Sequence, residues 1–190
     1  VNTVGERSCY DEGKRVAETL IYEYQKRFPD LDLKIARLFN TYGPRMDLND
    51  GRVITNFIRQ IKRGEPITIY GDGTQTRSFC YIDDTVRGLV AFMAAPSADT
   101  NVLNAGPVNI GNPGCEFTMN ELVDVFRHAL QRPGTGYDES NGAFEVKYLP
   151  RTQDDPMCRR PVITKAQELF GFECKVGLEE GIQRVWDYFL

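Results

Sequence analysis

The sequence of 190 residues has little of what metal-binding, nucleic-acid-binding and membrane-spanning proteins need. It holds a single histidine, His128, and five scattered cysteines with no C-x-x-C pair and no zinc-type spacing to that histidine. We therefore assign no metal site and expect unpaired thiols. The formal net charge of -4 provides no basic surface for nucleic acid. No apolar run approaches the ~18 residues of a membrane span, and no signal-peptide pattern opens the chain, so we expect no membrane contact from it.

The sequence also lacks the glycine-rich turn with which dinucleotide-binding folds hold a pyrophosphate. Neither G-x-G-x-x-G nor G-x-x-G-x-x-G follows an expected strand, and the 17 glycines are scattered over turns and helix ends. The usual pyrophosphate site of such a fold is therefore missing from these residues.

What is present is an alternation of helical and extended patterns. The composition, 41% hydrophobic and 26% charged, is ordinary for a soluble globular protein. Hydrophobic periodicity predicts helices over 8–27, 52–63, 84–94, 119–131, 164–170 and 178–189, and strands over 33–39, 67–70, 77–81, 144–149 and up to about 112. Asp83 is the expected cap of the third helix, and Thr118 with Glu121 predicts a capping box at the fourth. The alternation favours an α/β fold.

Tyr10 and Lys14 stand four residues apart in the first expected helix, so they share one face about a turn apart. A cation beside a phenol favours the phenolate and lowers the pKa of the tyrosine from its usual value of about 10. Such a pair can act as general base and acid toward an alcohol, as a nicotinamide-linked sugar enzyme requires. The spacing alone is a weak indication, because it arises often by chance.

Four blocks of sequence give this pair a setting. They read YDEGKRVAET at 10–19, ARLFNTYGPRM at 36–46, DGRVITNF at 50–57 and GDGTQTRSFCY at 71–81. In this order they closely resemble the UDP-glucuronic acid decarboxylases (UDP-xylose synthases) of the extended short-chain dehydrogenase/reductase superfamily. The resemblance runs from about residue 3 to the C-terminus. It weakens around 132–142, which we expect to be an inserted loop.

The resemblance implies roles for the first helix and for a late arginine. Tyr10 would take the proton of the sugar C4 hydroxyl while hydride passes to NAD+, and Lys14 would hold the nicotinamide ribose and keep the tyrosine acidic. Residues 154–161 (DDPMCRRP) resemble the family's DDPxxRKP segment, whose arginine, here Arg159, reaches the sugar carboxylate. Arg160 replaces the usual lysine and Val162 the usual aspartate, and both departures leave Arg159 in place.

The resemblance also implies roles for further residues, from their positions in the sequence. The resemblance places the nucleotide sugar on Asn40, Val53, Ile54, Thr55, Asn56, Phe57, Tyr70, Gly71, Asp72 and Arg77. Of these, Tyr70 and Arg77 would lie at the uracil and diphosphate. Thr41 and Arg52 would join Tyr10 and Lys14 at the cofactor, NAD. By residue type alone, Arg52 and Arg77 would instead be solvated charges, whereas the position at the end of a strand already singles out Asn40.

The resemblance also implies an architecture. The chain would be the C-terminal part of a Rossmann-type extended short-chain dehydrogenase/reductase fold plus a small α/β substrate-binding lobe. Residues 1–66 would hold part of the NAD-binding domain and the start of the lobe. Residues 67–190 would be mainly the nucleotide-sugar-binding lobe, with interleaved Rossmann elements near 77–112. Because the family's glycine-rich front half has no counterpart here, we expect a segment of a longer polypeptide rather than a self-sufficient protein.

Partners and compartment follow from the same resemblance. The substrate would be a UDP-sugar. The longer protein would be a homodimer with a four-helix interface, to which the first helix contributes an apolar face of Val16, Leu20 and Tyr24. The compartment would be the cytoplasm, although some relatives are Golgi enzymes held by an N-terminal anchor.

Two other functions compete with the decarboxylase. A nucleotide-sugar 4,6-dehydratase or 4-epimerase uses the same tyrosine and lysine but needs no carboxylate-binding arginine, so Arg159 favours the decarboxylase. A catalytically dead segment that binds a nucleotide sugar or a partner chain is favoured by the missing glycine-rich turn.

Overall fold

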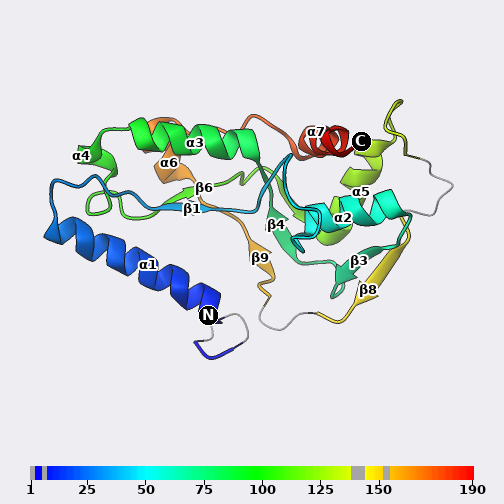
Figure 1. Ribbon diagram of the computed structural model, residues 1–190, viewed down its shortest axis with the longest axis horizontal. Helices are drawn as coiled ribbons and strands as arrows, with labels where there is room; N and C mark the ends of the chain where they lie inside the picture. Colours follow the sequence, from blue (N-terminus) through cyan, green and yellow to red (C-terminus); the bar gives the residue numbers. More distant parts are fainter. Residues whose placement is uncertain (1–2, 6–7, 138–143, 152–154) are drawn as a thin grey trace.

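The computed structural model describes residues 3–5, 8–137, 144–151 and 155–190, so Asp154 and part of the expected inserted loop lie outside it. The helices are α1 (Ser8–Arg27), α2 (Val53–Arg63), α3 (Ile82–Ala94), α4 (Ser97–Thr100), α5 (Met119–Leu130), α6 (Thr164–Phe170) and α7 (Leu178–Phe189). The strands are β1 (Ala36–Leu38), β2 (Thr41–Tyr42), β3 (Ile67–Tyr70), β4 (Thr76–Ser78), β5 (Cys80–Tyr81), β6 (Val108–Ile110), β7 (Glu116–Thr118), β8 (Val146–Leu149) and β9 (Cys158–Arg159). Figure 1 shows α1, α3, α6, β1 and β6 at one end of the long axis and α2, α5, α7, β3 and β8 at the other.

The strands are short and pair mostly in parallel. β1 pairs with β6, β2 with β5 and β3 with β8, each in parallel. A further sheet has the strand order β7–β4–β9, in which β4 is antiparallel to β7 and parallel to β9. Parallel pairs that alternate with helices along the chain confirm the predicted α/β class.

Local sequence determines where several helices begin and end. α5 begins with the predicted capping box, in which Thr118 Oγ1 accepts from the Glu121 N–H and the Glu121 carboxylate accepts from the Thr118 N–H. α2 ends at Gly64, whose φ of 63° is a left-handed conformation that glycine adopts readily. The predicted cap at Asp83 is wrong, because α3 begins at Ile82. Asp83 lies inside the first turn, where a carboxylate is stabilised by the helix dipole.

Two hydrophobic clusters form the core. The larger packs α2, α5 and α7 against β3 and includes Phe57, Phe126 and Trp186. The smaller packs α3 and α6 against β6 and includes Phe92 and Ile110. Because each cluster draws on distant parts of the sequence, the chain passes between the two ends more than once. The predicted division of the chain at residue 66 stays a prediction.

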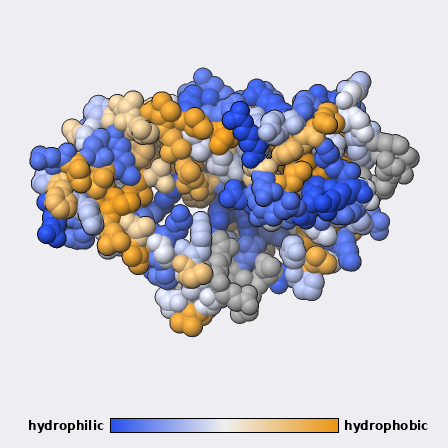
Figure 2. Space-filling view, viewed as in Figure 1, coloured by the Kyte–Doolittle hydropathy of each residue, from blue (hydrophilic) through white to orange (hydrophobic). Residues whose placement is uncertain are grey.

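Apolar side chains of α1 lie uncovered on the outside of the molecule. Val16, Leu20 and Tyr24 are exposed, and the buried residues of this helix are Ser8 and Gln25. Figure 2 shows apolar residues spread over the end of the molecule that holds α1 and α3. No helix in the described part of the chain has the length and apolar character to cross a membrane. The face predicted for dimerisation is therefore present, while the dimer itself stays a prediction.

Candidate functional site

α1 presents Tyr10 and Lys14 together to solvent. The side chain of Tyr10 is exposed, and Lys14 Nζ lies 5.7 Å from the centre of its ring. This is the predicted one-turn spacing, and it places an ammonium group over the phenol. Both groups can therefore act on a hydroxyl that approaches this face of the helix.

Side-chain contacts tie α1 to β1 and to the loop between them. Arg37 of β1 donates from Nε to Glu18 Oε1 at 2.7 Å and from Nη2 to Oε2 at 2.5 Å. This bidentate contact holds the pKa of Glu18 below its usual range, with the Arg37 hydrogen bond as the main cause. The buried Gln25 donates to the Leu31 carbonyl and accepts from the Leu33 N–H. The helix that bears the tyrosine–lysine pair is thus held in a fixed place beside β1.

β1 leads directly into Asn40 and Thr41. The Asn40 carbonyl accepts from the Cys80 N–H at 3.1 Å, which joins the end of β1 to β5. Thr41 Oγ1 lies 3.1 Å from Thr85 Oγ1 of α3. Both predicted site residues are half-buried at the carboxyl end of a parallel strand. Their position agrees with the general location of ligand sites in α/β sheets.

α2 contains five of the residues predicted to hold the nucleotide sugar. Ile54, Thr55 and Phe57 are buried, so their side chains are turned away from any ligand at the surface. Val53 and Asn56 are half-buried. The first turn of a helix has backbone N–H groups without intrahelical partners, so contact from the buried residues would have to come from the backbone.

The turn after β3 is built around Asp72. Its carboxylate accepts from the N–H and the hydroxyl of Thr74 at 3.0 and 2.7 Å, and these two bonds are the main causes that lower the pKa of Asp72. Gly71 has a left-handed φ of 79°, which glycine adopts without strain. Tyr70 ends β3 with its ring exposed. An exposed ring beside a fixed turn can stack on a planar base.

The β7–β4–β9 sheet brings together two of the predicted arginines. Arg77 of β4 and Arg159 of β9 are register partners, so their side chains leave the same face of the sheet. Arg77 is only 9% exposed, and its Nη2 lies 2.7 Å from Asp155 Oδ2. The interpretation of Arg77 as a solvated charge is therefore wrong. Arg52 is solvated, with 67% of its side chain exposed.

Glu116 organises the opposite face of this sheet. Its carboxylate accepts from Thr76 Oγ1 at 2.7 Å and from Cys158 Sγ at 3.3 Å, and lies 3.6 Å from Arg160 Nε. The Thr76 bond, followed by the Cys158 bond, holds the pKa of Glu116 below its usual range. One carboxylate therefore links all three strands. Sequence reasoning missed Glu116, because no spacing in the sequence indicates that these side chains meet.

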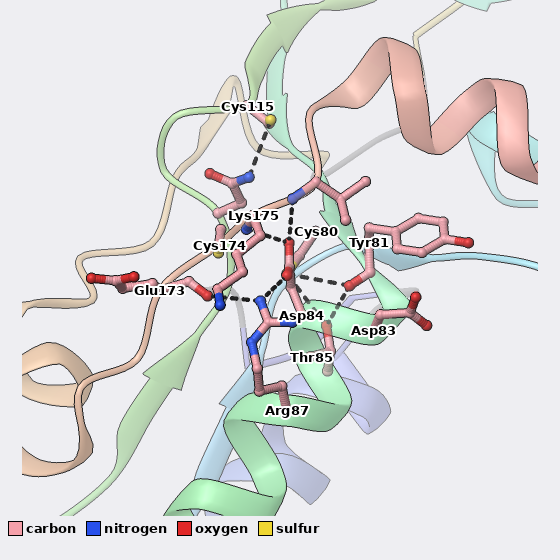
Figure 3. A network of polar contacts seen from close by, with 12 residues as sticks. Cys80, Tyr81, Asp83, Asp84, Thr85, Arg87, Cys115, Glu173, Cys174 and Lys175 are labelled. Atoms are coloured by element: carbon pink, nitrogen blue, oxygen red, sulfur yellow. Dashed lines mark hydrogen bonds and ion pairs between the residues drawn. The ribbon is translucent and has the colours of Figure 1, made fainter.

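Figure 3 shows a second group that the sequence did not reveal, around Asp84 of α3. This side chain is fully buried. Oδ2 accepts from the N–H groups of Lys175 and Val176, both at 3.0 Å, and Oδ1 pairs with Arg87. These bonds attach the segment before α7 to α3. The sequence predicts only a helix cap at Asp83 and does not indicate that the adjacent Asp84 is buried.

The five cysteines are free thiols, as predicted. Cys174 Sγ donates to the Gly111 carbonyl at 3.3 Å, and Cys80 Sγ accepts from Thr85 Oγ1 at 3.3 Å, close to Asp84 in Figure 3. The interaction between the two neighbouring thiols is the main cause that lowers the pKa of Cys80 and raises the pKa of Cys174. The two thiols therefore belong to the packing around α3 rather than to the face that bears Arg77 and Arg159.

Curated relatives of high identity are decarboxylases of a nucleotide sugar. UDP-glucuronic acid decarboxylase 5 of Arabidopsis thaliana is 50% identical over 182 residues, which cover 96% of this chain and 48% of that protein. UDP-glucuronic acid decarboxylase 1 of Xenopus tropicalis is 47% identical over 189 residues, covering 100% of this chain and 40% of that protein. The chain spans about half the length of the curated relatives it matches.

Solved structures of similar fold include sugar-nucleotide epimerases. The UDP-glucuronic acid 4-epimerase of Bacillus cereus in complex with UDP-glucuronic acid and NAD has a TM-score of 0.79 and 27% identity, covering 99% of this chain and 56% of that one. The UDP-glucose 4-epimerase of Thermotoga maritima with UDP-glucose has a TM-score of 0.77 and 31% identity, covering 93% and 51%. Residues 2–111 match a family model described as the NAD dependent epimerase/dehydratase family. The chain therefore belongs to the NAD dependent epimerase/dehydratase family.

Proposed function

We propose that this chain supplies the tyrosine–lysine pair and the nucleotide-sugar site of an NAD-dependent enzyme that converts UDP-glucuronate to UDP-xylose. The observation that carries the proposal is the register pairing of Arg77 with Arg159. UDP-glucuronate has two separate anionic groups, a diphosphate and a carboxylate. Two guanidinium groups on one sheet face provide one cation for each.

Different residues of this chain would bind different parts of the nucleotide sugar. Tyr70 would stack on the uracil, Arg77 would bind the diphosphate, and Arg159 would bind the carboxylate with its planar guanidinium. Asn40 would contact the sugar from the end of β1. This arrangement is supported by the exposed ring of Tyr70 and by the common face of the two arginines.

The proposed chemistry begins at the C4 hydroxyl of the sugar. Tyr10, with the Lys14 ammonium over its ring, would accept the hydroxyl proton and later return it. NAD, when bound, supplies the hydride acceptor and then the hydride donor at C4. A ketone at C4 lies β to the carboxylate on C5, so the bond to that carboxylate can break with its electron pair delocalised onto the ketone oxygen. Arg159 would hold the carboxylate in place for this step.

The residues that the structure describes can bind the nicotinamide half of NAD. Tyr10 and Lys14 share an exposed helix face and can hold the nicotinamide ribose. Thr41 and Arg52 would be further contacts, as the family resemblance implies. The sequence has no glycine-rich turn for the pyrophosphate. Because turnover needs bound NAD, we propose that the 190-residue chain alone does not convert UDP-glucuronate.

A 4-epimerase remains the alternative with support of its own. The structurally similar Bacillus cereus enzyme is a UDP-glucuronic acid 4-epimerase and was solved with UDP-glucuronic acid. A carboxylate-binding Arg159 therefore does not by itself separate decarboxylation from epimerisation of the same substrate. The 50% identity to a decarboxylase over 96% of the chain favours decarboxylation.

We also propose that the working enzyme is a homodimer that uses the apolar face of α1, and that it acts in the cytoplasm. The exposed Val16, Leu20 and Tyr24 support the interface, because an apolar helix face is stabilised when a partner covers it. The compartment rests on the family resemblance alone.

The function is tested by joining this chain to the amino-terminal half of the Arabidopsis thaliana relative and supplying NAD+ with UDP-glucuronate labelled in its carboxyl carbon. The proposal predicts labelled carbon dioxide and UDP-xylose, with the rate reduced about a hundredfold or more by Tyr10→Phe. An epimerised product that retains the label would establish the epimerase instead. Binding of UDP-glucuronate without any conversion in a folded joined protein would indicate a catalytically dead segment.

A further inference from the structure

Asp155 fixes the guanidinium of Arg77 from one side. Asp155 Oδ2 lies 2.7 Å from Arg77 Nη2, and the two side chains are 27% and 10% exposed. On its other side, Arg77 Nη1 donates to the Thr76 carbonyl at 2.7 Å. A guanidinium held at both ends in a largely buried place has little freedom to rotate.

Asp155 is itself held in place by the segment after β8. Arg151 Nη2 donates to the Asp155 carbonyl at 2.5 Å. The same Arg151 side chain lies beside the turn after β3, where a Cβ added at Gly71 would come within 3.6 Å of Arg151 Cβ. The carboxylate that orients Arg77 is thus connected to the turn that bears Tyr70 and Asp72.

The charge balance around Arg77 also depends on this carboxylate. Arg159 leaves the same sheet face at the register position of Arg77, so two cations stand side by side. Like charges at neighbouring positions repel, and the Asp155 carboxylate beside Arg77 reduces this repulsion.

From these contacts we propose that Asp155 is a positioning residue, which holds Arg77 in the orientation that binds the diphosphate of the nucleotide sugar. The inference rests on the proposed function for the identity of the ligand. Asp155 touches no reacting atom in this proposal and acts through Arg77.

The direction of the change in Kd distinguishes an orienting role of Asp155 from a purely electrostatic one. Removal of a negative charge beside an anion site should strengthen anion binding if Asp155 acts only through its field. Removal of the group that fixes Arg77 should weaken binding, because the guanidinium must then be ordered when the ligand binds. The two roles therefore predict changes in Kd of opposite direction.

The experiment measures the Kd of UDP for the 190-residue chain by calorimetry, with Asp155→Asn compared with the parent sequence. We expect UDP to bind about three- to tenfold more weakly to the variant, with UDP-glucose and UDP-glucuronate weakened by the same factor. Asp124→Asn is the matched control, since it removes a carboxylate from the exposed Arg127–Asp124 pair on α5 and should leave all three unchanged. Tighter UDP binding, or an unchanged Kd, in Asp155→Asn would overturn the inference.

A double-mutant cycle excludes a merely structural effect. In an Arg77→Ala background, Asp155→Asn should not weaken UDP further, because no guanidinium remains to be oriented. A further loss of similar size in that background would assign Asp155 to the stability of the fold and contradict the proposal.

A ligand-free measurement keeps the inference separate from the proposed function. In NMR spectra of the chain labelled with nitrogen-15, the Arg77 Nε–Hε signal should be sharp and slow to exchange, and should broaden or vanish in Asp155→Asn but not in Asp124→Asn. An unaltered Arg77 signal contradicts the positioning role. If the chain binds none of the UDP ligands, the proposed function of this chain fails, and the Arg77 signal alone decides the inference.

Discussion

Arg77 of β4 and Arg159 of β9 are register partners across a parallel strand pair, although they are far apart in the sequence. Arg77 Nη2 lies 2.7 Å from Asp155 Oδ2. The sheet that aligns them is held on its other face by Glu116, which accepts from side chains of both β4 and β9. The spacing of two cations on one face therefore follows from the backbone pairing and not from flexible surface chains.

Two glycines in helices should respond oppositely to alanine. A Cβ at Gly181 of α7 would lie 1.9 Å from the hydroxyl of Tyr42, whose ring is buried and cannot move aside freely. Gly181→Ala should lower the free energy of unfolding by about 1–3 kcal/mol. At Gly13 of α1 a Cβ would meet nothing within 4 Å. Gly13→Ala should therefore raise the free energy of unfolding by up to about 1 kcal/mol. Urea titrations followed by circular dichroism measure both, and equal effects would contradict the packing described for α7.

Asp84 should contribute far more to stability than its neighbour in the sequence. Asp84→Asn places an amide NH2 or a neutral oxygen against two backbone donors and leaves Arg87 without its carboxylate, which should cost about 3 kcal/mol. Asp83→Asn is the control, because that side chain is 62% exposed and should change stability by no more than about 0.5 kcal/mol. Thermal unfolding of the two variants provides the comparison. A similar small loss in both would show that the Asp84 network does not hold the segment before α7.

The contact between Glu18 and Arg37 predicts a pH dependence of stability. The pKa of Glu18 is lower in the folded chain than its ordinary value, mainly because of the Arg37 hydrogen bond. Its contribution is therefore present above the unfolded pKa and is lost as the pH falls through the folded pKa. Glu18→Gln should lower the free energy of unfolding by about 0.5–1 kcal/mol at pH 7, with the difference shrinking in acid. Glu23→Gln, at an exposed position of the same helix, is the matched control variant.

The exposed apolar face of α1 predicts self-association of the chain. Val16, Leu20 and Tyr24 remain uncovered, so a second copy can bury them. Sedimentation at concentrations of tens of micromolar should show dimers or larger species, and Leu20→Glu should shift the chain toward monomer. Thr19→Glu adds the same charge at a neighbouring exposed position and should shift it less. A monodisperse monomer for the parent sequence would contradict the proposed interface.

Features that depend on neighbouring residues could be predicted from the sequence. The bounds of α6 and α7 agree with the predicted 164–170 and 178–189, because helical periodicity and helix ends are local properties. The capping box of Thr118 and Glu121 was found for the same reason. Tyr10 and Lys14 are likewise one helical turn apart, so their proximity was already determined by the helix.

Features that depend on distant contacts could not be predicted. β7 and β9 are three and two residues long, too short for an alternating pattern to reveal them. The burial of Arg77 depends on Asp155, and the burial of Asp84 depends on amides of residues 175 and 176. Nothing around either residue in the sequence distinguishes it from a solvated charge. The family resemblance identified Arg77 and Arg159, but their common face became visible only in the fold.

The most direct test of the proposed substrate compares how Arg159→Ala changes the Kd of UDP-glucuronate, UDP-glucose and UDP. If Arg159 binds the sugar carboxylate, the loss of this charge-assisted contact should weaken UDP-glucuronate by about 2–4 kcal/mol, roughly thirtyfold to nearly a thousandfold. UDP-glucose and UDP should change little. Arg160→Ala is the matched control, because Arg160 is the next residue along the chain and pairs instead with Glu116. Selective loss of UDP-glucuronate in Arg159→Ala is the predicted result, and an equal loss for UDP-glucose and UDP-glucuronate would contradict a carboxylate-binding role for Arg159.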